Sequence, residues 1–183
     1  MKKSLLAFVG LVCLSGCATM QQQASGSATP LSIDYMVSAP FDQVWGKLVE
    51  RATDRSWPLK TIDKASGIIV TDFSSLGDGI SGWQALKQLA YEPSMFLATW
   101  AGGARMKLSV FVSKIAENQT RVKLNAHFEG FENNVTHQWV VWQSNGLDEK
   151  GVVDYIASEL HAQVQPYVNS TASTQGSSTS NAK

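Results

Sequence analysis

Two neighbouring stretches with a strict two-residue alternation constrain the fold of this chain most. Every second side chain is apolar in RMKLSVFVSK (residues 105–114), and the pattern returns in TRVKLNAHFEGF (residues 120–131) after the short turn ENQT. Successive side chains of a strand point to opposite faces, so each stretch would bury one face and expose the other. Together they predict a β-hairpin, and therefore a sheet that is covered on one side.

Further strands and a helix are predicted before this hairpin. Alternation over residues 31–39 indicates a first strand. Pro40 then begins a helix to about residue 55, because its fixed φ suits a first helical turn. Residues 56–73 predict a second hairpin that turns at Lys64–Gly67.

The segment after the central hairpin predicts one more strand and a final helix. In THQWVVWQ (residues 136–143), Trp139 and Trp142 would point to opposite faces of a strand. An apolar stripe at helical spacing predicts a C-terminal helix of about five turns. Its members are Val153, Ile156, Leu160, Val164 and Tyr167. The predicted fold class is α+β: an antiparallel sheet that grips a long C-terminal helix.

An insertion, residues 74–104, separates two of the predicted strands. It is expected to form a short helix with an apolar face, which Pro93 ends, and then an apolar loop. A hairpin needs only a few residues, so this excursion must either pack as a lid on the core or bind a protein or lipid. The candidate binding residues are Trp83, Leu86, Phe96 and Trp100.

The amino-terminal residues predict export. Two lysines precede the apolar run SLLAFVGLVCL (residues 4–14), which has the length of a secretory signal. The tetrad Leu14-Ser15-Gly16-Cys17 resembles the bacterial lipobox. This resemblance implies that residues 1–16 are a signal peptide, that Cys17 is acylated, and that the protein is held by lipid at a membrane. Cys13 would leave with the signal.

The position after Cys17 is Ala18 rather than Asp, which in such lipoproteins favours the outer membrane facing the periplasm. Residues 17–30 then predict a lipidated cysteine and a flexible tether, residues 31–168 one domain, and residues 169–183 a disordered tail.

Composition and motifs argue against several function classes. Fifteen basic residues balance fifteen acidic ones, so no cationic surface for nucleic acid is expected. The polar residues His127, Glu129, Glu132 and His137 are expected to be solvated, and no cofactor, metal or catalytic site is predicted. Ser81 lacks the second glycine of a nucleophile elbow.

A family resemblance covers most of residues 37–168. The first helix carries the pattern P-F-D-x-V-W (residues 40–45), and the hairpin carries D-x-x-x-G-x-x-x-T at Asp63, Gly67 and Thr71. These residues resemble the BamC-like (NlpB-like) helix-grip domains of bacterial outer-membrane lipoproteins. BamC has two such domains and a long ordered amino-terminal stretch, whereas this chain has one domain and a short tether.

Three hypotheses for function follow, in this order. The first is a non-catalytic, outer-membrane-anchored module that binds a periplasmic or outer-membrane protein, with envelope or outer-membrane protein assembly as its process. The second is a protein that binds lipid or a small apolar ligand in a cavity under the C-terminal helix. The third is an enzyme, for which His127, Glu129 and His137 are the only candidates.

Overall fold

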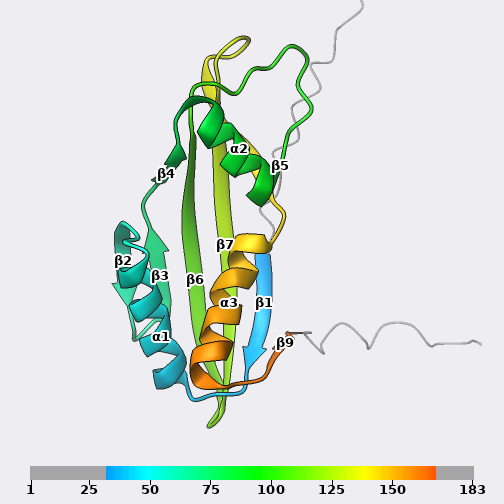
Figure 1. Ribbon diagram of the computed structural model, residues 1–183. Coiled ribbons are helices and arrows are strands. Elements are labelled where there is room, and N and C mark those ends of the chain that lie inside the picture. Colours follow the sequence, from blue (N-terminus) through cyan, green and yellow to red (C-terminus); the bar gives the residue numbers. More distant parts are fainter. Residues whose placement is uncertain (1–31, 168–183) are drawn as a thin grey trace, which may run out of the picture.

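The computed structural model describes residues 32–167, and two long central strands run through it (Figure 1). Strands β6 (Ala104–Ala116) and β7 (Gln119–Glu132) pair antiparallel, from Ala104 opposite Gly130 to Ala116 opposite Gln119. The predicted central hairpin is therefore confirmed, and its turn is only two residues long.

Shorter strands flank the central pair in two tiers and complete an open, antiparallel, nine-stranded sheet within residues 32–167. The lower tier of Figure 1 has the order β2-β3-β6-β7-β1-β9. In the upper tier β4 pairs with β6, while β8 pairs with β7 and β5 pairs with β8. The bounds are β1 (Ser32–Val37), β2 (Leu59–Asp63), β3 (Ile68–Thr71), β4 (Ser74–Gly77), β5 (Ala90–Tyr91), β8 (Gln138–Ser144) and β9 (Val164–Pro166).

Three helices lie on the same face of the sheet (Figure 1). Helices α1 (Phe41–Asp54) and α3 (Leu147–Leu160) cover the lower tier and contact each other, whereas α2 (Gly79–Leu89) covers the upper tier. The arrangement is a mixed α/β fold in which one sheet face is packed and the other carries no described helix.

The alternation of β6 and β7 decides which residues form the core. Even-numbered side chains of β7 from Val122 to Phe128 are at most 1% exposed, and their odd-numbered neighbours are partly or fully exposed. Apolar residues of the three helices complete this core. Among them are Val44, Leu48, Leu86, Val152, Val153 and Ile156, each at most 2% exposed.

The uncovered face of the sheet is polar and internally paired. Arg121 Nε donates to Asp34 Oδ1 at 2.8 Å. Arg105 Nε donates to Glu129 Oε2 at 2.7 Å, and the Arg105 guanidinium lies between the rings of Phe73 and Trp139, at 4.1 and 4.0 Å from their centres. These pairs satisfy most of the charge that the alternating pattern places on this face.

The predicted C-terminal helix is shorter than expected. Helix α3 ends at Leu160, His161 adopts a left-handed φ of 50°, and the chain returns as β9 to pair with β1. The prediction was wrong about Val164, which lies in β9, and about Tyr167, which follows β9 outside any helix. The left-handed His161 ends the helix at Leu160, and Pro166 prevents helical geometry from continuing through residues 165 and 166 because it has no N–H group and restricts the residue before it.

The insertion between β3 and β6 contains more regular structure than expected. A four-residue strand, β4, pairs with β6 before α2 begins. The predicted helix is present as α2, but it ends at Leu89, and Ala90 starts β5. Two residues of β5 pair with β8, so the chain has already left the helix before Pro93.

Candidate functional site

Two loops meet at the upper end of the molecule in Figure 1, and we call them together the tip. The tip consists of residues 92–103, which lead from β5 to β6, and residues 133–137, which lead from β7 to β8. Neither residues 93–104 nor residues 133–147 contain Asp, Glu, Lys or Arg. The tip is therefore almost free of charge in a protein whose other surfaces carry many ion pairs.

The buried carboxylate of Glu132 holds the two loops of the tip together. The side chain is 0% exposed. Its oxygens accept hydrogen bonds from the backbone N–H groups of Thr99 at 3.1 Å in one loop, and of Asn134 at 2.7 Å and Val135 at 2.8 Å in the other. Thr136 adds its backbone N–H and its hydroxyl.

The protonation state of Glu132 follows from this environment. Burial by itself would raise the pKa of the carboxyl, but hydrogen bonds from the backbone N–H groups of Thr136, Asn134, Thr99 and Val135 outweigh it and lower the pKa from 4.5 to about 2. The group is therefore charged at every physiological pH.

The two residues after Glu132 add further bonds between the loops. Asn133 Oδ1 accepts from the Thr99 hydroxyl and from the backbone N–H of Ala101, each at 3.1 Å. Asn134 Nδ2 donates to the carbonyl oxygen of Leu97 at 2.8 Å. Such dense bonding makes the tip a rigid part of the fold, because each loop satisfies the polar groups of the other.

The rigid tip presents apolar side chains to solvent. Phe96 is 86% exposed, Leu97 is 63% exposed and Val135 is 52% exposed. Leu97 also adopts a positive φ of 58°, and His137 a positive φ of 53°. Leucine rarely adopts such a φ, whereas histidine does so more often, and backbone strain like that at Leu97 collects at functional sites. Exposed apolar residues on a fixed, strained frame are typical of an interaction surface.

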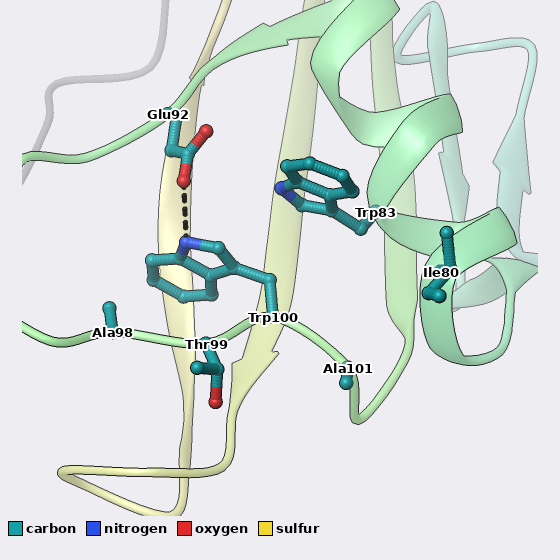
Figure 2. Close-up of a pocket in the computed structure, with 7 residues that line it drawn as sticks. All are labelled: Ile80, Trp83, Glu92, Ala98, Thr99, Trp100 and Ala101. Carbon is teal, nitrogen blue, oxygen red and sulfur yellow. Dashed lines mark hydrogen bonds between the residues drawn. The ribbon is translucent and has the colours of Figure 1, made fainter.

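A hollow of about 260 Å³ lies beside the tip, between α2 and residues 98–101 (Figure 2). Trp83 of α2 and Trp100 of the tip bound it, and the Trp100 indole Nε1 donates to Glu92 Oε1 at 2.8 Å. On its other side Trp100 packs edge-on against Trp142 in the core, with 5.1 Å between ring centres. The lining residues are Ile80, Trp83, Glu92, Ala98, Thr99, Trp100 and Ala101.

The four candidate binding residues occupy three different environments. Leu86 is 0% exposed and Trp100 is 6% exposed, so both belong to the core. Trp83 is partly buried and packs against that core while it lines the hollow. Phe96 stands free on the tip. Helix α2 of the insertion is thus a lid on the core, whereas the loop after it presents an exposed surface. Cys17 lies outside the described residues.

The polar residues that were weighed for catalysis are not gathered into one site. His127 Nε2 lies 2.8 Å from Glu129 Oε1, and Glu129 is also bonded to Arg105 on the uncovered sheet face. His137 is in the β7–β8 loop. Glu129 and Glu132 differ by three positions in one strand and so point to opposite faces. Within residues 32–167 no three His, Cys, Asp or Glu side chains are grouped to hold a metal ion.

The space under α3 is filled by its own side chains. Val152, Val153 and Ile156 are at most 2% exposed and pack into the core. A hollow of about 200 Å³ lies between α1 and α3 and is partly polar, because Arg51, Arg55 and Asp148 contribute to its wall. Burial raises the pKa of Asp148 although both arginines oppose the shift.

Sequence reasoning missed the role of Glu132, which was expected to be a surface carboxylate. The strand alternation contained the signal, because Glu132 continues the even-numbered, inward series of β7. This signal is weak, because carboxylates are rarely buried unless they are fully bonded.

Comparison with known proteins adds no further assignment. No protein-family model matches the chain. No curated protein sequence matches it either. In the described part of the chain, none of the helices has the length and apolar character that crossing a membrane requires.

Proposed function

We propose that this protein is a lipid-anchored outer-membrane lipoprotein that binds another envelope protein through its tip and performs no catalysis itself. The observation that carries the proposal is the group Phe96, Leu97 and Val135, exposed at 86%, 63% and 52% on loops that Glu132 fixes in place. Apolar and aromatic side chains in an uncharged setting are typical of the centres of protein interfaces.

Anchoring and location come from the sequence. The lipobox-like tetrad that ends at Cys17 would place an acyl anchor there, and Ala18 favours the outer membrane, facing the periplasm. Two or more acyl chains hold a protein stably at a bilayer, whereas one chain does not. Labelling of cells with a palmitate analogue should mark the chain, and Cys17→Ser should abolish the label. Equal labelling of the variant would refute the anchor.

The BamC-like helix-grip assignment is the finer part of the proposal. A sheet with helices packed on one face and a helix near the C-terminus is compatible with it. The process in which the protein would act is therefore envelope or outer-membrane protein assembly. A lipid-binding role under α3 receives less support, because that helix packs directly on the sheet through Val152, Val153 and Ile156.

Photocrosslinking in living cells tests the binding surface. A photoreactive amino acid replaces Phe96 or Val135 in the tip, and Ile115 serves as the matched control. Ile115 is an exposed apolar residue, 47% exposed, next to the β6–β7 turn at the other end of the sheet. The proposal expects one shared protein adduct from the tip positions and none from Ile115. Adducts of the same kind from all three, or from Ile115 alone, would contradict it.

A further inference from the structure

The hollow beside the tip combines apolar walls with one hydrogen-bond donor that the protein leaves unused. The indole Nε1 of Trp83 is buried, and none of the described residues offers it an acceptor. Figure 2 shows this nitrogen directed toward the space bounded by Glu92 and Trp100. An indole N–H can only donate, so its burial without a partner is unfavourable until an acceptor arrives.

Glu92 supplies the complementary acceptor. Its Oε1 receives the Trp100 N–H at 2.8 Å, but a carboxylate has about four acceptor positions, so capacity remains. Its charge is already balanced, because Lys87 Nζ lies 3.8 Å from Oε2. The same Lys87 Nζ stands 4.6 Å from the centre of the Trp83 ring. Lys87 does not line the hollow, but it already pairs with Glu92, so a neutral ligand is favoured over a cationic one.

Size limits the occupant further. Pockets for drug-sized ligands measure about 300–1,000 Å³. The hollow, at about 260 Å³, lies below that range. It suits one apolar side chain together with a small polar group.

The geometry points to a neutral peptide ligand: the hollow takes an apolar side chain of the partner protein, while a backbone amide next to that side chain accepts from Trp83 and donates to Glu92. This inference rests on the proposed function, since the partner that contacts Phe96 and Val135 would supply the residue. Peptide amides carry one donor and one acceptor, which is the pair that Trp83 and Glu92 complement.

Indole NMR resonances give a direct test. The full-length chain, labelled with ¹⁵N-tryptophan and held in phospholipid nanodiscs, is titrated with N-acetyl-L-leucinamide as the probe. Trp83→Phe identifies the Trp83 indole signal. Trp142 is the internal control, because its Nε1 is also buried and unpartnered but does not line the hollow. The inference expects a saturable downfield shift of the Trp83 N–H signal and no shift of Trp142.

Three further arms define the ligand class. N-acetylglycinamide, which lacks the apolar side chain, should bind several-fold more weakly than the leucine probe. Trp83→Phe, observed through the Trp100 signal, should weaken binding of the leucine probe about fivefold, the effect of losing one hydrogen bond. A response to monomeric dihexanoyl phosphatidylcholine but not to the leucine probe would overturn the peptide assignment in favour of a lipid.

The result is separable from that of the proposed function. An unshifted Trp83 signal in the folded protein would overturn this inference even if crosslinks from Phe96 and Val135 identify a partner. Probe binding without any partner adduct from the tip would instead leave the hollow as a peptide site and remove the proposed protein interaction.

Discussion

Truncation of Leu86 measures how firmly α2 belongs to the core. Leu86 is 0% exposed, and its Cδ2 lies 3.0 Å from the position that a Cβ on Gly130 would occupy, so it packs directly on the backbone of β7. Leu→Ala changes in cores cost about 2–5 kcal/mol, and the cost rises with the cavity that remains. Gly130 has no side chain with which to fill that cavity. We therefore expect Leu86→Ala to lower the free energy of unfolding by about 3–4 kcal/mol.

Urea unfolding followed by tryptophan fluorescence and by circular dichroism provides the assay. Ile80→Ala is the matched control, because Ile80 lies on the same helix but is 66% exposed. It should change the free energy of unfolding by no more than about 0.5 kcal/mol. A loss of unfolding free energy below about 1 kcal/mol for Leu86→Ala, or equal losses for the two variants, would refute the packing of α2. Leu86 would then again be a candidate binding residue.

Three further predictions concern the backbone and the tip. Gly67 has a φ of 68°, and an added Cβ would stand 1.9 Å from the carbonyl oxygen of Val112. Gly67→Ala should therefore lower the free energy of unfolding, measured in urea, by more than about 2 kcal/mol. As the control, Gly46→Ala in the open interior of α1 should raise it by about 0.5 kcal/mol. The Glu132 carboxylate, with its pKa lowered from 4.5 to about 2, stabilises the fold fully above pH 4.5 and loses this effect as the pH falls toward 2. Thermal melts of the wild type and Glu132→Gln should therefore differ most at neutral pH and converge in acid, and a constant difference would contradict the assignment. Leu97→Asn relieves a φ of 58°, so it should raise stability by up to about 1 kcal/mol while it reduces crosslinking from the tip; a clear loss of stability would show that the strain is absent.

The two central strands could be predicted because the information for them is local. Alternation in β6 and β7 fixed their faces, and the opposite orientations expected for Trp139 and Trp142 are confirmed at 38% and 1% exposed. The same rule assigns Glu132 to the inner face. Alternation could not reveal that Thr99, which comes more than thirty positions earlier in the chain, lies close enough for its N–H to donate to this carboxylate. Together with the N–H groups of residues 134–136, this contact makes the buried carboxylate favourable.

The carboxy-terminal end of the predicted C-terminal helix shows a different limit. Helical spacing continued by chance through Val164 and Tyr167, although Pro166 argued against a helix there. In the structure Val164 pairs with Val37, and the ring of Tyr167 lies 4.2 Å from the Arg121 guanidinium. Edge pairing with β1 depends on residues far apart in the chain, so periodicity alone could not reveal it.

The candidate site was predictable only in part. Composition drew attention to the insertion, but Trp100 and Leu86 share its apolar character with Phe96, and only packing distinguishes core from surface. Val135 could not be predicted as part of the site, since one valine in a polar loop forms no pattern. It joins Phe96 because Glu132 bonds both loops.

The central claim is tested most directly by placing a charge in the tip and measuring how much crosslinked adduct forms from Val135. With the photoreactive residue at Val135, Phe96→Asp is compared with Ile62→Asp, an exposed apolar position on edge strand β2 that is 48% exposed. The account predicts that Phe96→Asp lowers the yield about tenfold, the effect of a hot-spot loss above 1 kcal/mol, while Ile62→Asp leaves it unchanged. Equal yields from the two variants, at equal protein levels, would contradict the tip as the binding surface.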